Sequence, residues 1–300
     1  MRKLLFISLI LLLSCKNNKK NSFISNGLTI ITKDYELVKA KKPEALLIVF
    51  PGGGSSAKET KRDFKIIDIA RKKHISVIFM NYGGKLWMEK EDKESLSKKL
   101  HIIVKKHNLN TENVFIGGMS IGGTVAITIA DYLNGNSTDL KTKGVFVIDS
   151  PIDLYALYES SKKDVARKDF SEERLAEPKW IINYFEEKFG ENDSLLRNIQ
   201  KVSPFTFKTE NINNIKNLKD VKLRFYTEPD TLWLQKNRQT DFKSSNAYTL
   251  QKTATILKNN AWEKSELIQT KNKGIRFNGE RNPHSWSIVN VDEIINWILE

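Results

Sequence analysis

The stretch NVFIGGMSIGGTVAITIA, residues 113–130, decides the fold. It opens with a short apolar run at 114–116 that is typical of a buried strand. The motif Gly118-Met119-Ser120-Ile121-Gly122 follows, and after it comes an apolar segment at 124–133 that lacks Gly and Pro and favours a helix. The stretch therefore predicts a strand, a sharp turn with a serine at its tip, and a helix.

The predicted turn gives Ser120 a particular geometry. A strained backbone at this position would lift the serine hydroxyl above the sheet. We expect Gly118 and Gly122 to be required, because a side chain at either position would collide with the neighbouring strand or helix. The same five-residue pattern also fits an ordinary glycine-rich turn, and only the flanking strand and helix give it a catalytic meaning.

With its flanking elements, this motif resembles the nucleophile elbow of the α/β-hydrolase fold. The resemblance covers the order of elements in roughly the whole mature chain, but only the elbow is highly specific. Independently of it, strands predicted at 45–50, 75–80, 144–148 and 221–226 alternate with helical patterns such as 58–73 and 91–107. This alternation predicts an α/β fold with a mostly parallel sheet flanked by helices on both faces.

The resemblance implies a triad in the chain order Ser, Asp, His. Ser120 is then the nucleophile, Asp230 follows the strand predicted at 221–226, and His284 lies between the last predicted strand and the last predicted helix. A serine hydroxyl needs a base, which His284 would supply, and the imidazole needs a carboxylate to fix its tautomer. Because polar residues at the carboxyl ends of parallel strands converge on one edge, these side chains can meet.

The identity of the acid stays open at this point. Asp230 is the preferred candidate. Glu228 lies two residues before it, and Asp149 and Asp153 follow the preceding strand, where some lipases place their acid. All of these carboxylates would lie near the same edge of the sheet.

A glycine-rich loop supplies the expected oxyanion site. The buried run at 45–50 is followed at once by Pro51-Gly52-Gly53-Gly54, which resembles the oxyanion loop of lipases and esterases, with Pro51 where that motif has His. Backbone amides around Gly53 and Gly54 would meet the amide of Ile121 across the oxyanion. A phosphate-binding loop is the rival interpretation, but the Gly-Lys-Ser/Thr ending is absent.

The amino terminus predicts export and a lipid anchor. Residues 1–14 combine a basic start with an apolar run that is too short to span a bilayer, and they read as a signal peptide. The run ends at Cys15 in a pattern that resembles a bacterial lipobox; ordinary cleavage with a free cysteine is the alternative. We expect a flexible tether at 15–26, a hydrolase domain at 27–300, and a bacterial envelope protein held to a membrane by acyl chains on Cys15.

A helical insertion is predicted within the domain. Residues 154–219 are rich in helix formers and lack strand patterns, with Pro178 as an interruption. We expect a cap above the carboxyl ends of the strands, where it would shape a substrate pocket; a packing or partner surface is the alternative.

The composition argues against several classes of partner and cofactor. The net charge is +13, mostly from scattered lysines, and no basic-aromatic motif points to nucleic acid. Cys15 is the single cysteine, so neither an internal disulfide nor a cysteine-based metal site can form. The histidines show no metal-ligand spacing, and we expect no metal and no cofactor.

The sequence thus predicts a serine hydrolase that cleaves a carboxylic ester, or an amide or peptide bond, through an acyl-enzyme. The substrate would be a small-molecule, glycan or lipid ester. Two alternatives are an acyltransferase on the same scaffold, which would pass the acyl group to a sugar or lipid alcohol, and a non-catalytic envelope lipoprotein that binds a ligand. The intact Ser-Asp-His order speaks against the last.

Overall fold

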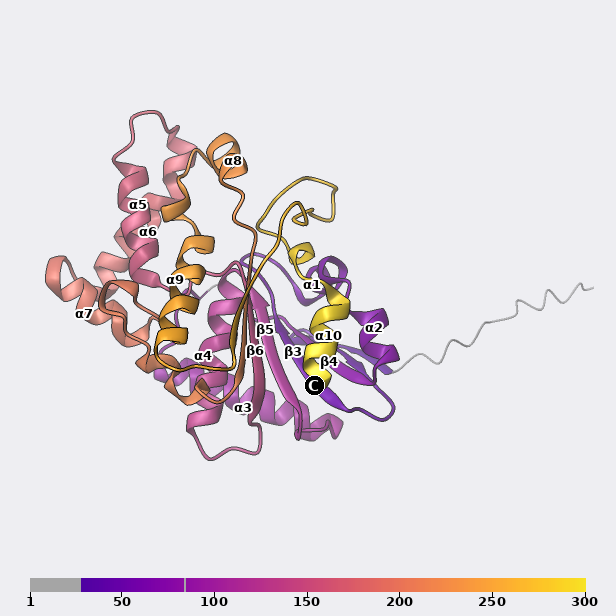
Figure 1. Ribbon diagram of the computed structural model, residues 1–300. Helices are drawn as coiled ribbons and strands as arrows, with labels where there is room; N and C mark the ends of the chain where they lie inside the picture. Colours follow the sequence, from indigo (N-terminus) through magenta and orange to yellow (C-terminus); the bar gives the residue numbers. More distant parts are fainter. Residues whose placement is uncertain (1–27, 84) are drawn as a thin grey trace, which may run out of the picture.

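The structure, a computed structural model, describes residues 28–83 and 85–300 (Figure 1). The predicted signal peptide at 1–14 and the tether at 15–26, with Cys15, lie outside the described residues.

One sheet forms the centre of the molecule. In the described part of the chain it has eight strands, in the spatial order β1-β2-β4-β3-β5-β6-β7-β8. β2 runs antiparallel to β1 and to β4, and every other neighbouring pair is parallel. The strands are β1 (Leu28–Ile31), β2 (Tyr35–Lys39), β3 (Ala45–Phe50), β4 (Ile75–Met80), β5 (Val114–Met119), β6 (Thr142–Ile148), β7 (Lys222–Thr227) and β8 (Ser265–Gln269).

The inner strands form where the sequence is mostly apolar. Every residue of β3 and of β4 is buried, because helices cover both faces of the sheet at this point. The apolar runs predicted as strands at 45–50 and 75–80 have the same bounds in the structure. The predicted α/β fold with a mostly parallel sheet is confirmed.

Helices pack on both faces of this sheet (Figure 1). One face is covered by α3 (Lys90–His107), α4 (Ile121–Gly135) and α9 (Asn246–Asn259). The other face is covered by α1 (Ala57–Phe64), α2 (Ile67–Lys72) and α10 (Val291–Leu299). The single helix predicted over 58–73 is wrong, since Lys65 adopts a left-handed conformation with φ of 53° and separates α1 from α2.

A helical segment lies between β6 and β7. It forms a lobe beside the sheet in Figure 1 and contains α5 (Leu154–Val165), α6 (Glu172–Phe189) and α7 (Asn192–Val202), followed by short 3-10 helices at Phe207–Thr209 and Asn213–Leu218. Pro178 does not interrupt it, because α6 continues through this residue. Trp87, from the loop after β4, packs among Tyr184, Phe185 and Phe189 with ring centroids 4.7–5.6 Å away.

Four further short helical turns occur in the loops of the described chain. They are α8 (Thr231–Trp233), a π-helical turn at Leu234–Arg238, and 3-10 turns at Phe242–Ser244 and Trp286–Ile288. No helix within the described ranges is both long and apolar enough to cross a membrane.

Candidate active site

Ser120 occupies the sharp turn between β5 and α4. Its backbone has φ of 56° and ψ of −132°, a conformation that residues other than glycine rarely adopt. The N–H of Ser120 donates to the carbonyl of Ile148, the last residue of β6, at 2.9 Å. The strained turn is thus tied to the neighbouring strand, and the predicted strand, turn and helix are all present.

Close backbone contacts leave no room for a side chain at either glycine of the elbow, Gly118 or Gly122. A Cβ added to Gly118 would lie 2.3 Å from the backbone of Gly122, and a Cβ on Gly122 would lie 2.2 Å from the carbonyl oxygen of Pro51. Both distances are far below any real Cβ contact. The absence of these side chains lets α4 start directly above the ends of β3 and β5, which places Ser120 at the carboxyl edge of the sheet.

His284 pairs with Asp149. The imidazole Nδ1 lies 2.6 Å from Oδ2 of Asp149, and the two side chains are 28% and 14% exposed. Asp149 immediately follows β6 and has φ of 41°, a second strained backbone beside Ser120 in the described chain. Its N–H donates to the carbonyl of Tyr226 in β7 at 2.9 Å, which fixes the strained residue to the next strand.

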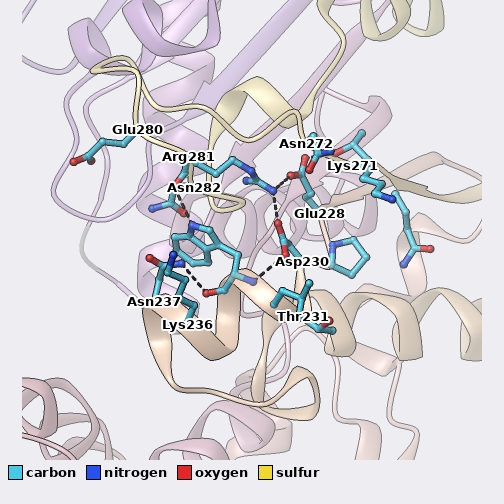
Figure 2. A pocket seen from close by; sticks show the side chains of 15 residues that line it. Glu228, Asp230, Thr231, Lys236, Asn237, Lys271, Asn272, Glu280, Arg281 and Asn282 are labelled. Carbon is cyan, nitrogen blue, oxygen red and sulfur yellow. Dashed lines mark hydrogen bonds and ion pairs between the residues drawn. The ribbon is translucent and has the colours of Figure 1, made fainter.

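The expected pairing of Asp230 with His284 is wrong. Asp230 Oδ2 accepts from Nη2 of Arg281 at 2.6 Å, and its Oδ1 accepts from the N–H of Trp233 at 2.9 Å, which caps α8 (Figure 2). Because both carboxylate oxygens are engaged by other donors, this side chain is held away from the imidazole. Asp149, which follows the neighbouring strand, takes the position instead.

The other two candidate acids have structural partners. Asp153 is buried and accepts from the N–H groups of Ala156 and Phe207 at 2.9 and 2.7 Å, so it caps α5 and binds the backbone at the start of the first 3-10 helix. Burial raises the pKa of Asp153 above its ordinary value. Glu228 is also buried, and it accepts hydrogen bonds from the loop that precedes His284.

Ser120 and His284 line one cleft of about 640 Å³. No hydrogen bond joins Oγ of Ser120 to the imidazole in the described residues. Catalytic hydrogen bonds are often long in ligand-free enzymes and shorten when substrate binds. With Nδ1 held by Asp149, Nε2 is the nitrogen left to face a nucleophile.

The glycine loop borders this cleft at Gly52 and Gly53. A Cβ on Gly52 would lie 3.8 Å from Cβ of Ser120, and one on Gly53 would lie 3.8 Å from Cγ2 of Ile121. Neither Gly53 nor Ile121 donates its N–H to another described residue, so both donors are available to an oxyanion.

Gly54, the third residue expected at the oxyanion site, does not line the cleft. It has φ of 74° and sits in a tight turn that is closed by the N–H of Ser55 donating to the carbonyl of Gly52 at 3.1 Å. This turn directs the chain into α1 and makes Gly52, rather than Gly54, the glycine beside Ser120.

The rest of the cleft wall is mixed, with charged side chains beside apolar ones such as Ile275 and Phe277. Arg62, Asp63 and Arg276 line it together with Glu177 of α6, so the helical insertion reaches the cleft. The aromatic side chain of Trp286 also lines this cleft. Trp233 lines a separate cavity, and Tyr82 packs at the edge of the core, where burial raises its pKa to about 12.

Sequence reasoning did not single out Gly52, Glu177 or Arg276. Gly52 stood inside the recognised motif, but only the turn geometry shows which glycine faces Ser120. Glu177 and Arg276 come from the helical insertion and a long loop, whose positions no local pattern fixes. Asp149 could have been preferred from its place directly after a buried strand, next to the strand that carries the elbow.

Comparisons with known proteins show similarity in structure but not in sequence. No family model matches the chain, and no curated protein matches it. Among solved structures it is similar to FphF, a fluorophosphonate-binding serine hydrolase of Staphylococcus aureus, at 14% identity and a TM-score of 0.54, covering 91% of this chain and 97% of that one.

Two further solved structures show the same similarity. An esterase of the bacterial hormone-sensitive lipase family has 15% identity and a TM-score of 0.56, with 92% of this chain and 84% of that one covered. Carboxyl esterase 2 of Tuber melanosporum has 12% identity and a TM-score of 0.56, with 94% and 89% covered. Together with the strand order and the elbow, these similarities establish an α/β-hydrolase fold.

Proposed function

We propose that this protein is a serine hydrolase that cleaves carboxylic esters, with Ser120 as nucleophile, His284 as base and Asp149 as the acid. The observation that carries the proposal is the 2.6 Å pairing of His284 with Asp149 at the cleft that also holds the strained Ser120. The structurally similar proteins support it, because their names describe serine hydrolases and esterases.

The chemistry proceeds through an acyl-enzyme. His284 takes the hydroxyl proton as Oγ of Ser120 attacks the ester carbonyl, and the N–H groups of Gly53 and Ile121 stabilise the oxyanion. The imidazolium then protonates the leaving alcohol. Asp149 keeps the imidazole in the tautomer that leaves Nε2 free to accept the proton and stabilises the charge that forms. Water, activated by the same imidazole, releases the acid.

The test is steady-state hydrolysis of p-nitrophenyl esters of graded acyl length by the wild-type chain and by Ser120→Ala. We expect the wild type to turn over short-chain esters and the variant to lose at least about 1,000-fold in kcat/KM with its circular dichroism spectrum unchanged. Activity that is equal in both proteins would refute the assignment of Ser120.

A further inference from the structure

The loop that carries His284 is folded back on itself. It leaves β8 after Gln269. Its first arm, residues 270–274, runs away from β8, and its second arm, residues 281–283, returns to His284. The two arms meet where the N–H of Asn282 donates to the carbonyl of Gly274 at 2.8 Å. A Cβ on Gly274 would lie 2.3 Å from the carbonyl oxygen of Asn282, so the backbones are in direct contact. His284 follows the second arm, and its N–H donates to Oδ1 of Asn282 at 2.9 Å.

The buried side chain of Glu228 binds the first arm of the loop. Its side chain is 1% exposed, and one carboxylate oxygen, Oε2, accepts three hydrogen bonds: from Oγ1 of Thr270 at 3.0 Å and from the N–H groups of Lys273 and Gly274 at 2.8 and 3.0 Å. A buried carboxylate is unfavourable unless it is fully paired. The loop therefore satisfies the charge of Glu228, and Glu228 in turn fixes the loop.

Arg281 binds the second arm to the same carboxylate (Figure 2). Its Nη2 forms an ion pair with Oε1 of Glu228 and lies 2.6 Å from Oδ2 of Asp230, while its Nη1 donates to the carbonyl of Gly274 at 3.0 Å. The guanidinium borders an open cavity of about 1190 Å³, and its pair with Asp230 is correspondingly more exposed than its pair with Glu228.

Glu228, the residue directly after β7, thus binds the first arm itself and the second arm through Arg281. The same strand holds Asp149, whose N–H donates to Tyr226 two residues before Glu228. We propose that the Glu228–Arg281 ion pair is a positioning device that sets the imidazole of His284 against Asp149 and Ser120. This inference rests on the proposed function for its effect on rate, but its structural part does not depend on it.

Positioning of this kind acts on turnover more than on substrate affinity. Neither Glu228 nor Arg281 lines the cleft that holds Ser120, so we expect no contact of either with substrate. A displacement of about 1 Å in a catalytic group costs on the order of 100-fold in rate. Loosening the ion pair should therefore lower kcat and leave KM nearly unchanged.

The experiment uses the full chain in detergent and compares Glu228→Gln, Arg281→Met and the double variant with the wild type. Arg224→Met is the matched control, because Arg224 lies on β7, forms an ion pair with Glu266 at 2.8 Å and does not line the cleft. Two quantities are measured: kcat and KM for a short-chain p-nitrophenyl ester, and the downfield proton NMR resonance of the Nδ1–H of His284 in its hydrogen bond to Asp149.

We expect each single variant to lose about 10- to 100-fold in kcat with KM within about 2-fold, and to broaden or shift the His284 resonance. The double variant should lose little more than the worse single one, because both substitutions break the same interaction. Arg224→Met should keep the resonance and most of kcat.

An unchanged resonance and a kcat equal to that of Arg224→Met in both single variants would overturn the positioning role. If the wild type hydrolyses no ester, the proposed function fails. The resonance then still decides the inference, because it reports the pairing of His284 with Asp149 without any turnover.

Discussion

Two aspartates stand at the carboxyl ends of adjacent parallel strands, and only one of them meets the imidazole. Asp149 follows β6 and lies 2.6 Å from Nδ1 of His284, whereas Asp230 follows β7 and is bound by Arg281 and the N–H of Trp233. The two positions lie near the same edge of the sheet, so the choice between them depends on which partner each carboxylate finds there.

Substitution by asparagine separates the two roles. Asp149→Asn places an amide opposite Nδ1 and favours the wrong imidazole tautomer, so we expect kcat to fall about 1,000- to 10,000-fold. Asp230→Asn keeps the cap on the N–H of Trp233 and leaves Arg281 paired with Glu228, so we expect a change below about 5-fold. Both are measured by steady-state ester hydrolysis.

The folded state of both variants is checked by thermal unfolding. A larger loss of kcat in Asp230→Asn than in Asp149→Asn would contradict the assignment of the acid and restore Asp230 as the candidate.

Among the catalytic residues, the sequence predicted those that a local pattern marks, and it did not decide which carboxylate is the acid. Ser120 stands in a motif with a fixed spacing, and His284 is the single histidine between the last strand and the last helix. The acid has no such signature. The order Ser, Asp, His is satisfied by Asp149 as well as by Asp230, and the deciding partner, Arg281, lies far from both in the chain.

The strands and the elbow were predictable because their patterns are local. β3 is a continuous apolar run and β4 is interrupted only by Ser76, a pattern expected of strands that are buried on both faces. The break at Lys65 was not predicted, because the residues around it include apolar Phe64, Ile66 and Ile67 and the stretch 57–73 contains neither Gly nor Pro. Pro178 was expected to interrupt the helical insertion, but α6 continues through it, so the proline does not mark a break here.

The close contact between the elbow and the glycine loop should make the protein sensitive to any side chain added at Gly122. Gly122→Ala places a Cβ 2.2 Å from the carbonyl oxygen of Pro51, which must move together with the oxyanion loop. We expect the free energy of unfolding to fall by about 3 kcal/mol, measured by urea denaturation, because overpacking a tight backbone contact has this order of cost.

Gly83→Ala is the matched control, since a Cβ there meets no atom within 4 Å. Its free energy of unfolding should change by less than about 0.5 kcal/mol. Equal stability of Gly122→Ala and the control would show that α4 does not press on the loop as closely as the structure indicates.

On the scale of the whole molecule, the described residues form a domain with an α/β-hydrolase fold, and the pattern of residues 1–15 predicts where the protein resides. The lipid anchor at Cys15 lies outside the described residues and stays a prediction from the pattern of residues 1–15. The net charge of +13, which becomes +11 when Arg2 and Lys3 leave with the predicted signal peptide, would favour contact of the anchored chain with an anionic membrane surface, although scattered surface lysines also account for it.

Cys15→Ser in the full chain tests the anchor. We expect the wild type, expressed in a bacterium, to sediment with membranes and to carry the mass of its acyl chains, because Cys15 is the residue to which a bacterial lipobox attaches lipid. The variant should lack that mass and leave the membrane fraction with its ester hydrolysis per mole unchanged. A wild-type chain without added lipid mass would instead favour ordinary signal cleavage.

The most direct measurement of the central claim is the intact mass of the protein after reaction with a fluorophosphonate, followed by peptide mapping. The account predicts one adduct per chain, located on Ser120, its loss in Ser120→Ala, and strongly slowed labelling in His284→Ala and Asp149→Asn. An adduct on any other residue, or equal labelling of the Ser120→Ala chain, would contradict it.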